Sequence, residues 1–295
     1  MTKSLAIIGA GRVGRALGRS LREAGWNIVI VAARSENSAK KSVRFIGGGR
    51  ATAGLPATLT GASTILLAVP DDAIAPVADD LSQTIKDEWP GKVVLHTSGA
   101  LDASVLQPLR RSGAAVGTMH PLQSFIGVSV PPLEGKVFAI DGDEAATRIA
   151  RRIARTLGGI PVTIQSERKP LYHAAGAFGA GLLLALEETG VQLLMQAGLR
   201  RREAQRALLS LSRQVLDNYE KLGPQKAWTG PLSRGDYGVV QSHQRALRQV
   251  GPEYLAAYDA VSRLAARVLA HHPEATLQAL HLISENLQSA KAKGD

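Results

Sequence analysis

The 295-residue chain contains no cysteine, which excludes disulfide bonds, thiolate metal sites, iron–sulfur clusters and cysteine nucleophiles. Aromatic residues are also scarce, at 4% of the composition. The longest apolar run extends only from Ala174 to Leu186, whereas a membrane-spanning helix needs about 20 apolar residues. The apolar stretch Leu5–Ile8 is too short for the core of a signal peptide. We therefore expect a cytoplasmic protein without a membrane segment, in which residues 174–186 form a helix buried in the core or at a subunit interface.

Acidic residues are fewer than basic ones, 25 against 35, which gives a formal net charge of +10. A basic protein can bind nucleic acid, a membrane surface or an anionic small molecule. Arginines cluster in two places, at Arg148, Arg151, Arg152 and Arg155 and at Arg200, Arg201 and Arg202. Neither cluster is interleaved with the aromatic residues that single-strand binders use, so solvated helix faces are favoured, and attraction for phosphorylated or carboxylate ligands is the alternative. We expect a small-molecule substrate and no nucleic-acid partner.

Short apolar runs alternate with segments of helical spacing through the first half of the chain. Strands are predicted at Ser4–Ile8, Ile28–Val31, Thr64–Val69, Lys92–Leu95, Ala114–Thr118, Val137–Ile140 and Ile160–Ile164. Helices are predicted between them, at Arg12–Ala24, Ser38–Ile46, Ala73–Ile85, Ala103–Arg111 and Glu144–Leu157. This alternation is typical of a parallel sheet with crossover helices.

No strand pattern follows Ser166. Long helical patterns run through Tyr172–Met195, Arg202–Tyr219, Val239–Val250, Glu253–Ala270 and Pro273–Lys291. The fold class is therefore α/β followed by all-α, with a doubly wound Rossmann domain at residues 1–165 and an all-helical domain at residues 166–295. Because the apolar 174–186 run is rich in small residues that allow close approach, we expect this helical domain to form a homodimer.

A glycine-rich turn follows the first predicted strand. Gly9-Ala10-Gly11-Arg12-Val13-Gly14 reads G-x-G-x-x-G and opens a helix, as dinucleotide binding needs. The first glycine permits the tight turn, the second lets the backbone approach the pyrophosphate, and the third lets the helix pack on the strand. The free N–H groups of the helix N-terminus then face the phosphates. We expect a cofactor-binding loop of Gly9, Gly11, Arg12, Val13 and Gly14, with an ordinary glycine-rich turn as the alternative.

The end of the second predicted strand indicates which dinucleotide binds. NAD-binding proteins usually place an acidic residue there to grip the ribose 2′-hydroxyl, whereas this chain reads Val31-Ala32-Ala33-Arg34-Ser35. The Arg34 guanidinium can pair with a 2′-phosphate, and the Ser35 hydroxyl can donate a hydrogen bond to it. We therefore predict NADP(H) as the cofactor; a solvated loop arginine is the alternative.

Three further strand ends carry candidate site residues. Parallel sheets bind ligands beyond the carboxyl ends of their strands, and the residues that follow these strands are Val69, Pro70 and Asp71, then Ser98 and Gly99, then His120. The first five are predicted to line the cofactor crevice. The Ser98 hydroxyl can hydrogen-bond the nicotinamide carboxamide or a substrate oxygen.

Together these motifs resemble a bacterial family of Rossmann-like proteins that carry a helical domain of unknown function, DUF2520. The matching stretches are Gly9–Gly14, Leu67–Asp71, His96–Ala100, His120–Phe125, Tyr172–Ala175, Thr229–Pro231 and Arg234–Asp236. The resemblance implies an NADP-dependent oxidoreductase without a defined substrate. It also implies an architecture related to pyrroline-5-carboxylate reductase and the beta-hydroxyacid dehydrogenases, with a C-terminal domain similar to that of 6-phosphogluconate dehydrogenase.

Hydride transfer needs orientation of the reactants and one group that exchanges a proton with the substrate. His120 is the first candidate and is expected to supply a proton near neutral pH. Tyr172 and His173, which open the first helix after the last strand, complete the predicted catalytic set with Ser98. His96 lies inside an apolar strand and is interpreted as a hydrogen-bonded core histidine. The seven histidines show no HExxH-type spacing, so we expect no metal site.

The beta-hydroxyacid dehydrogenase mechanism does not transfer to this sequence. Those enzymes carry a lysine within the corresponding helix and an asparagine one turn later. Residues 174–181 contain no lysine and end in Gly181, where DUF2520 relatives usually have asparagine. Two functions stay open: an oxidoreductase of a small, anionic carbonyl or imine, and a non-catalytic NADP(H)-binding sensor or interaction protein. Arg234, near Asp236, is a candidate clamp for a substrate carboxylate.

Overall fold

The computed structural model describes residues 3–127 and 129–292. The chain divides into two compact units, Met1–Gly181 and Leu182–Asp295. The last strand ends at Thr163, in agreement with the predicted change from strands to helices near Ser166. The first helix after that strand stays with the first unit.

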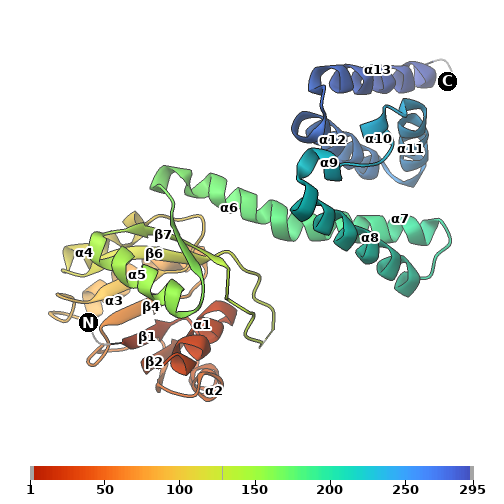
Figure 1. Cartoon of the computed structure of the whole chain (residues 1–295). Helices are drawn as coiled ribbons and strands as arrows, with labels where there is room; N and C mark the ends of the chain where they lie inside the picture. The colour runs from red at the N-terminus through yellow and green to blue at the C-terminus, as the bar shows by residue number, and fades with distance from the viewer. Residues whose placement is uncertain (1–2, 128, 293–295) are drawn as a thin grey trace. The chain divides into compact units, whose positions relative to one another are not determined.

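The first unit is a sheet with helices on both faces (Figure 1). Its strands are β1 (Ser4–Ile8), β2 (Asn27–Ala33), β3 (Arg50–Ala53), β4 (Thr64–Leu67), β5 (Val93–His96), β6 (Ala115–Pro121), β7 (Val137–Gly142) and β8 (Ile160–Thr163). Its helices are α1 (Arg12–Glu23), α2 (Glu36–Ile46), α3 (Asp71–Thr84), α4 (Gln107–Arg111), α5 (Glu144–Thr156) and α6 (Lys169–Ala177), with short 3-10 turns η1 (Ala103–Leu106) and η2 (Ser166–Arg168).

The strands lie in the order β3-β2-β1-β4-β5-β6-β7-β8. Every neighbouring pair is parallel except β6 and β7, which are antiparallel. The register places Leu67 of β4 beside His96 of β5, and His96 beside Thr118 of β6. The carboxyl ends of β4, β5 and β6 therefore meet at one edge, as the sequence predicts.

Two features of the sheet differ from the prediction. The predicted parallel sheet has one antiparallel pair, β6 and β7, because the described part of the connection 122–136 holds no crossover helix, and parallel neighbours need such a crossover. Strand β3 was not predicted. It is a four-residue edge strand, RATA, with no residue fully buried, so it lacks the apolar run by which the other strands were recognised.

Alternation along the strands builds a core on each face of the sheet. In β1, Leu5 and Ile7 pack with buried residues of α1, α2 and α5, while Ala6 and Ile8 pack with those of α3, η1 and α4. Each fully buried leucine or isoleucine contributes about 1.5–3 kcal/mol of transfer free energy. A strand held on both faces is a rigid support for the residues at its end.

The second unit is helical. Its helices are α7 (Leu183–Gln196), α8 (Arg201–Leu222), α9 (Pro224–Ala227), α10 (Pro231–Arg234), α11 (Tyr237–Val250), α12 (Pro252–Leu269) and α13 (Pro273–Ala292). A small core of Val240, Ala266, Leu280 and Ile283 joins α11, α12 and α13. Helices α9 and α10 were not predicted, because each has only four residues, too few to show a helical period.

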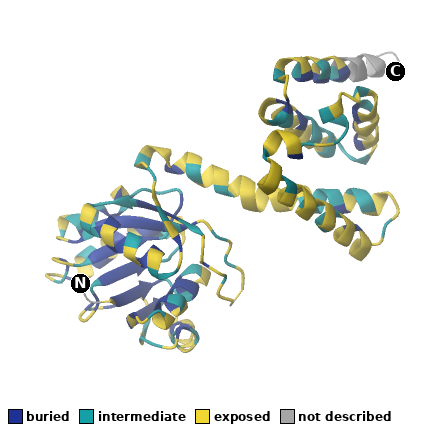
Figure 2. Cartoon of the chain, viewed as in Figure 1, coloured by how far each residue is buried: buried dark blue, intermediate teal, exposed yellow. Residues whose placement is uncertain are grey.

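The apolar run 174–186 differs from its prediction. It continues α6 through a π-helical turn, η3 (Phe178–Leu182), into α7, and its side chains are mostly exposed (Figure 2). Burial in the core of the chain is therefore wrong for this run, and the subunit interface stays a prediction. By length and composition alone, one helix of the described residues, Ser166–Gln196, could cross a membrane.

Candidate functional site

The glycine loop has the geometry that a dinucleotide needs. Gly9 has φ +97°, and a Cβ there would lie 2.4 Å from the Ala68 carbonyl oxygen. A Cβ on Gly14 would lie 2.2 Å from the Gly9 carbonyl oxygen, whereas one on Gly11 would meet nothing within 4 Å. Gly11 is also the N-cap of α1, and no side chain caps that helix. The loop therefore keeps open space above Gly11 at a helix N-terminus, where a pyrophosphate fits.

The end of β2 leads directly into α2. Arg34 is exposed, and Ser35 caps α2 because its hydroxyl accepts the Ser38 N–H at 3.3 Å. Glu36, the first acid after the strand, is paired with Lys40 at 2.6 Å. Pairing with Lys40 lowers the pKa of Glu36. The first acid after the strand is thus paired with a lysine, and Arg34 stands beside a helix N-terminus that favours an anion.

Ser98 joins two of the predicted strand ends. It is 4% exposed, and its hydroxyl donates to Asp71 Oδ2 at 2.8 Å while it accepts the N–H groups of Ala100 and Leu101 at 3.2 and 3.0 Å. A hydroxyl has one proton and two lone pairs, so this network uses all of them. Ser98 here positions the start of α3 and the turn after β5. The predicted donation to a carboxamide or substrate oxygen requires this network to open.

His120, Tyr172 and His173 lie together at the end of β6. The Nδ1 atom of His120 is 2.9 Å from the Tyr172 phenol oxygen, and the His120 ring is edge-on to the rings of Tyr172 and His173, with centroids 5.6 and 6.0 Å away. All three residues belong to the first unit, on β6 and α6.

Gly99 makes the room for this cluster. A Cβ on Gly99 would lie 2.9 Å from His120 Nε2 and 2.8 Å from His173 Cδ2. His173 itself is exposed. Two of the predicted strand ends, at Gly99 and His120, and the predicted helix start therefore form one site in which His120 Nε2 faces the turn after β5.

The environment of His120 decides its charge. Burial, followed by the neighbouring His173 and Lys169, lowers the pKa of His120 to about 4, against the opposing effect of Asp71. Burial also raises the pKa of Tyr172 to about 12, so the phenol stays protonated. The free protein holds His120 as a neutral imidazole at neutral pH, which corrects the expectation that it carries a second proton to supply there.

His96 is a core histidine, as the sequence indicates. It is 0% exposed, its Nδ1 accepts the Ser98 N–H at 3.2 Å, and its Nε2 lies 3.0 Å from the Asp102 carbonyl oxygen. These partners fix the tautomer with the proton on Nε2. Burial lowers the pKa of His96 to about 4, so this residue is neutral at neutral pH and orders the turn.

Lys169 is the site residue that sequence reasoning left out of the predicted set. It is 1% exposed, and its Nζ donates to Thr118 Oγ1 at 2.6 Å, two residues before His120 on β6. Its position gave little signal, because the helix predicted from the sequence begins only at Tyr172, whereas α6 begins at Lys169 itself.

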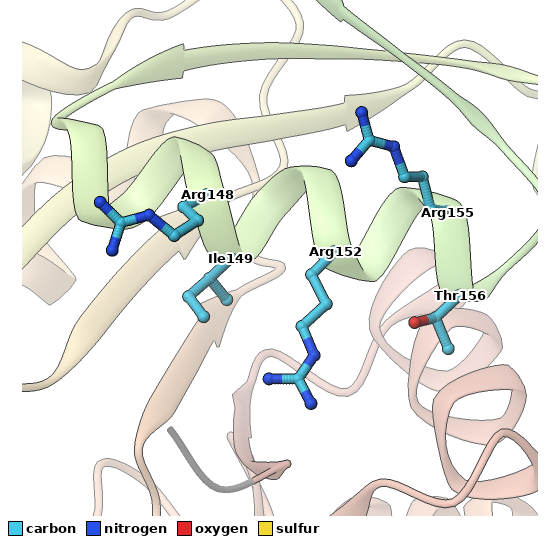
Figure 3. Close-up of a pocket in the computed structure, with 5 residues that line it drawn as sticks. All are labelled: Arg148, Ile149, Arg152, Arg155 and Thr156. Atoms are coloured by element: carbon cyan, nitrogen blue, oxygen red, sulfur yellow. The ribbon is translucent and has the colours of Figure 1, made fainter.

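Three of the four arginines of α5 have partners within the first unit. Arg148 pairs with Glu144 at 2.6 Å, Arg151 donates to Thr163 Oγ1 at 2.8 Å, and Arg152 lies over the Trp26 ring at 5.9 Å. Figure 3 shows Arg152 and Arg155 on different sides of the helix. A hollow of about 600 Å³ is lined by Arg148, Arg152 and Arg155, and it contains no predicted site residue. Arg234 likewise pairs with Asp236 at 2.9 Å, so its predicted role as a clamp competes with an existing ion pair.

Two family models match the chain. The Rossmann-like domain matches residues 2–121, and the domain of unknown function DUF2520 matches residues 136–265. The first contains the glycine loop and three strand ends. The second begins with β7 and includes Lys169, Tyr172 and His173. The His120–Tyr172 contact thus joins a residue from each matched region.

Solved structures share the fold. BF3122 from Bacteroides fragilis, assigned as an NADP oxidoreductase, aligns with TM-score 0.73 and 22% identity over 89% of this chain and 97% of its own. The reductive aminase from Aspergillus terreus, in complex with NADPH and ethyl-5-oxohexanoate, gives 0.69 and 18% over 90% and 94%. The pyrroline carboxylate reductase from Plasmodium falciparum, with NADP bound, gives 0.59 and 13% over 94% and 97%. The predicted fold class is therefore confirmed.

A curated protein also matches in sequence. A DNA ligase from Halorhodospira halophila (strain DSM 244 / SL1) is 30% identical over 207 residues, which are 68% of this chain and 26% of that protein. The chain thus spans about a quarter of the length of this relative. The chain thus joins a Rossmann-like domain, matched at residues 2–121, to a DUF2520 domain, matched at residues 136–265.

Proposed function

We propose that this chain is an NADP(H)-dependent oxidoreductase that acts on a small, anionic carbonyl or imine, or on the corresponding alcohol or amine. The observation that carries the proposal is the hydrogen-bonded His120–Tyr172 pair over Gly99, on the same sheet edge as the open glycine cradle at Gly11. NADP(H), when bound, supplies or accepts the hydride. The structural relatives that bind NADP or NADPH support this cofactor.

The residues that fit the cofactor are those of the sheet edge. The N-terminus of α1 above Gly11 suits the pyrophosphate, and Arg34 with the N-terminus of α2 suits a 2′-phosphate. Val69 and Pro70 follow β4, and Gly99 follows β5, on the way from that cradle to His120. Arg12 is exposed at the first turn of α1 and adds positive charge beside the phosphates.

His120 is the proton-exchanging group of the proposal. As a neutral imidazole it can accept a proton from a substrate hydroxyl or ammonium during oxidation. For reduction it must first gain a proton, and a substrate carboxylate nearby favours that charged form. Nε2 can accept the substrate proton in the tautomer in which the Nδ1–H of His120 donates to the Tyr172 phenol oxygen, and this tautomer leaves the unprotonated Nε2 toward the turn at Gly99. An anionic substrate also suits the net charge of +10.

A non-catalytic NADP(H)-binding sensor is the second candidate. It is favoured by the saturated hydrogen bonds of Ser98 and by Gly181, which has no side chain to orient a substrate and no atom within 4 Å of its Cβ position. Ligase activity is not carried over, because the match covers only 26% of the DNA ligase. A homodimer and a cytoplasmic location stay proposals from the sequence.

Binding and turnover measurements separate these functions. The purified chain is titrated with NADPH and NADH, and the absorbance of the reduced nicotinamide is then followed with 2-oxo acids, cyclic imino acids and their neutral esters. If the chain is the proposed oxidoreductase, it should bind NADPH and turn over one of these acids but not the neutral ester of that acid. NADPH binding without turnover of any of these compounds would favour the sensor. If NADPH does not bind, both proposed functions are overturned.

A further inference from the structure

The chain buries a lysine beside the proposed site without giving it an ion pair. Lys169 is 1% exposed, and among the described residues its Nζ has Thr118 Oγ1 as its hydrogen-bond partner and no carboxylate in an ion pair. Taking an ammonium group out of water is costly unless it is paired. Burial accordingly lowers the pKa of Lys169 to about 8, against the favourable charges of Asp141, Asp102 and Asp71.

Helix stability does not explain this position. Lys169 is the first residue of α6, where the dipole of the helix disfavours a cation, and the acidic residues that stabilise a first turn are absent from this one. A lysine at this place therefore lowers local stability. The contacts of its ammonium group are the place to look for a compensating role.

The contacts of Lys169 have a simple geometry. Thr118 and His120 are two residues apart on β6, so they share one face of the strand. Lys169, Tyr172 and His173 are three and four residues apart on α6, so they share one face of the helix. Two contacts join the strand face to the helix face. The first is the Lys169–Thr118 hydrogen bond of 2.6 Å, and the second, two residues further along β6, is the His120–Tyr172 contact of 2.9 Å.

We propose that Lys169 is a positioning residue of the site, whose buried ammonium group ties the first turn of α6 to Thr118 and so holds Tyr172 and His173 against His120. The purpose of this positioning rests on the proposed function, whereas its test needs neither cofactor nor substrate. Lys169 is not assigned as a nucleophile, because at 1% exposure its amine does not reach a substrate.

The ammonium group has a second effect on the same histidine. The titratable groups that face His120 are His173, Lys169 and Tyr172 from α6, His96 from β5 and Asp71 from α3. Only Asp71 favours protonation of His120. Burial is the main reason that the His120 imidazole is neutral, and the buried Lys169 ammonium adds to that effect.

The test is a histidine NMR titration of the full chain without cofactor. Four variants are compared. Lys169→Met removes the ammonium group and keeps the apolar stem, and Lys86→Met, at an exposed lysine of the same unit, is its matched control. Thr118→Val removes the hydroxyl that accepts the Lys169 hydrogen bond, whereas Thr118→Ser keeps a hydroxyl there. In Lys169→Met the pKa of His120 should rise above its wild-type value, whereas Lys86→Met should leave it unchanged. A structural role alone would not move this pKa in a folded protein.

Thr118→Val keeps the Lys169 ammonium group but removes the hydroxyl that accepts its hydrogen bond. The resonances of the His120 and Tyr172 rings should then shift and broaden, and Thr118→Ser should return them to the wild-type positions. If Lys169→Met does not fold, this Val and Ser pair decides the question. The proposal is overturned if folded Lys169→Met titrates like wild type, or if Thr118→Val and Thr118→Ser give the same ring resonances. Failure of NADPH binding in the wild type would instead count against the proposed function.

Discussion

The Nδ1 atom of His120 lies 2.9 Å from the phenol oxygen of Tyr172, although 52 positions separate the two residues in the chain. The first sits at the end of a sheet strand and the second in the first turns of α6. The contact leaves the opposite ring nitrogen, Nε2, over the turn at Gly99. This pair is the chemical centre of the proposed site, so it supplies the first prediction.

Removing either partner should lower turnover without weakening the binding of NADPH. His120→Gln removes the proton-exchanging group and should lower kcat about 100-fold or more. Tyr172→Phe removes one hydrogen bond, about 0.5–1.5 kcal/mol, which corresponds to a loss of roughly 2- to 10-fold in rate. Steady-state kinetics measure kcat of both variants, with the substrate identified among the 2-oxo acids and cyclic imino acids. A second histidine–tyrosine pair, His243 and Tyr258 at 3.0 Å in the helical unit, makes Tyr258→Phe the matched control, and an equal loss in that variant contradicts the assignment.

Arg34 should determine the preference for NADPH over NADH. Its guanidinium is exposed beside the N-terminus of α2, where a 2′-phosphate adds a charge-assisted contact worth about 1.5–3 kcal/mol. Arg34→Ala should remove most of the difference in Kd between the two cofactors. Fluorescence titration measures both, with the exposed Arg44→Ala of the same helix as control. Equal affinity of the wild type for NADPH and NADH would show that the residues at the end of β2 do not recognise the 2′-phosphate.

Gly11 and Gly14 should respond differently to alanine. A methyl group on Gly11 meets nothing within 4 Å, so Gly11→Ala should cost stability no more than about 1 kcal/mol while it obstructs the pyrophosphate and abolishes NADPH binding. A methyl group on Gly14 meets the Gly9 carbonyl oxygen at 2.2 Å, and such overpacking costs about 1–3 kcal/mol. Urea unfolding and NADPH titration separate the two effects. Undiminished NADPH binding by Gly11→Ala would argue against a dinucleotide at this loop.

Stability should fall as the pH is lowered from neutrality. His96 and His120 both have a pKa of about 4 in the folded protein, against about 6.5 in an unfolded chain. Between these values the unfolded state binds more protons, so the free energy of unfolding is highest above pH 6.5 and declines toward pH 4. For the fully buried His96 the loss is at most about 3 kcal/mol.

Urea unfolding at several pH values checks this slope. His96→Gln cannot titrate in this range, so its stability should depend less on pH than that of the wild type, whatever its stability at pH 7. His271→Gln, at an exposed position of the second unit, is the control. An unchanged slope in His96→Gln would show that the acid sensitivity arises elsewhere.

The sequence predicted the parts of this site better than their contacts. Each strand end could be located because a short apolar run stops at a glycine, proline or polar residue, and parallel strands must end at one edge. The partner of His120 could not be derived, because it depends on how α6 docks beside β6. Lys169 was overlooked as a site residue since lysines are almost never fully buried, and the composition carries no sign of the Thr118 hydroxyl that receives it.

The last prediction concerns the exposed apolar helix. Leu171, Phe178 and Leu184 are 73%, 60% and 70% exposed, and apolar residues that cluster on a surface usually mark an interface. We expect the chain to form a homodimer through this helix, with a dimer mass in light scattering at micromolar concentration. Phe178→Glu places a charge at the interface and should give a monomer. Leu211→Glu, at a residue of α8 that is also 60% exposed, should remain dimeric. A wild-type monomer would contradict the interface, and the helix would then need another partner for its apolar face.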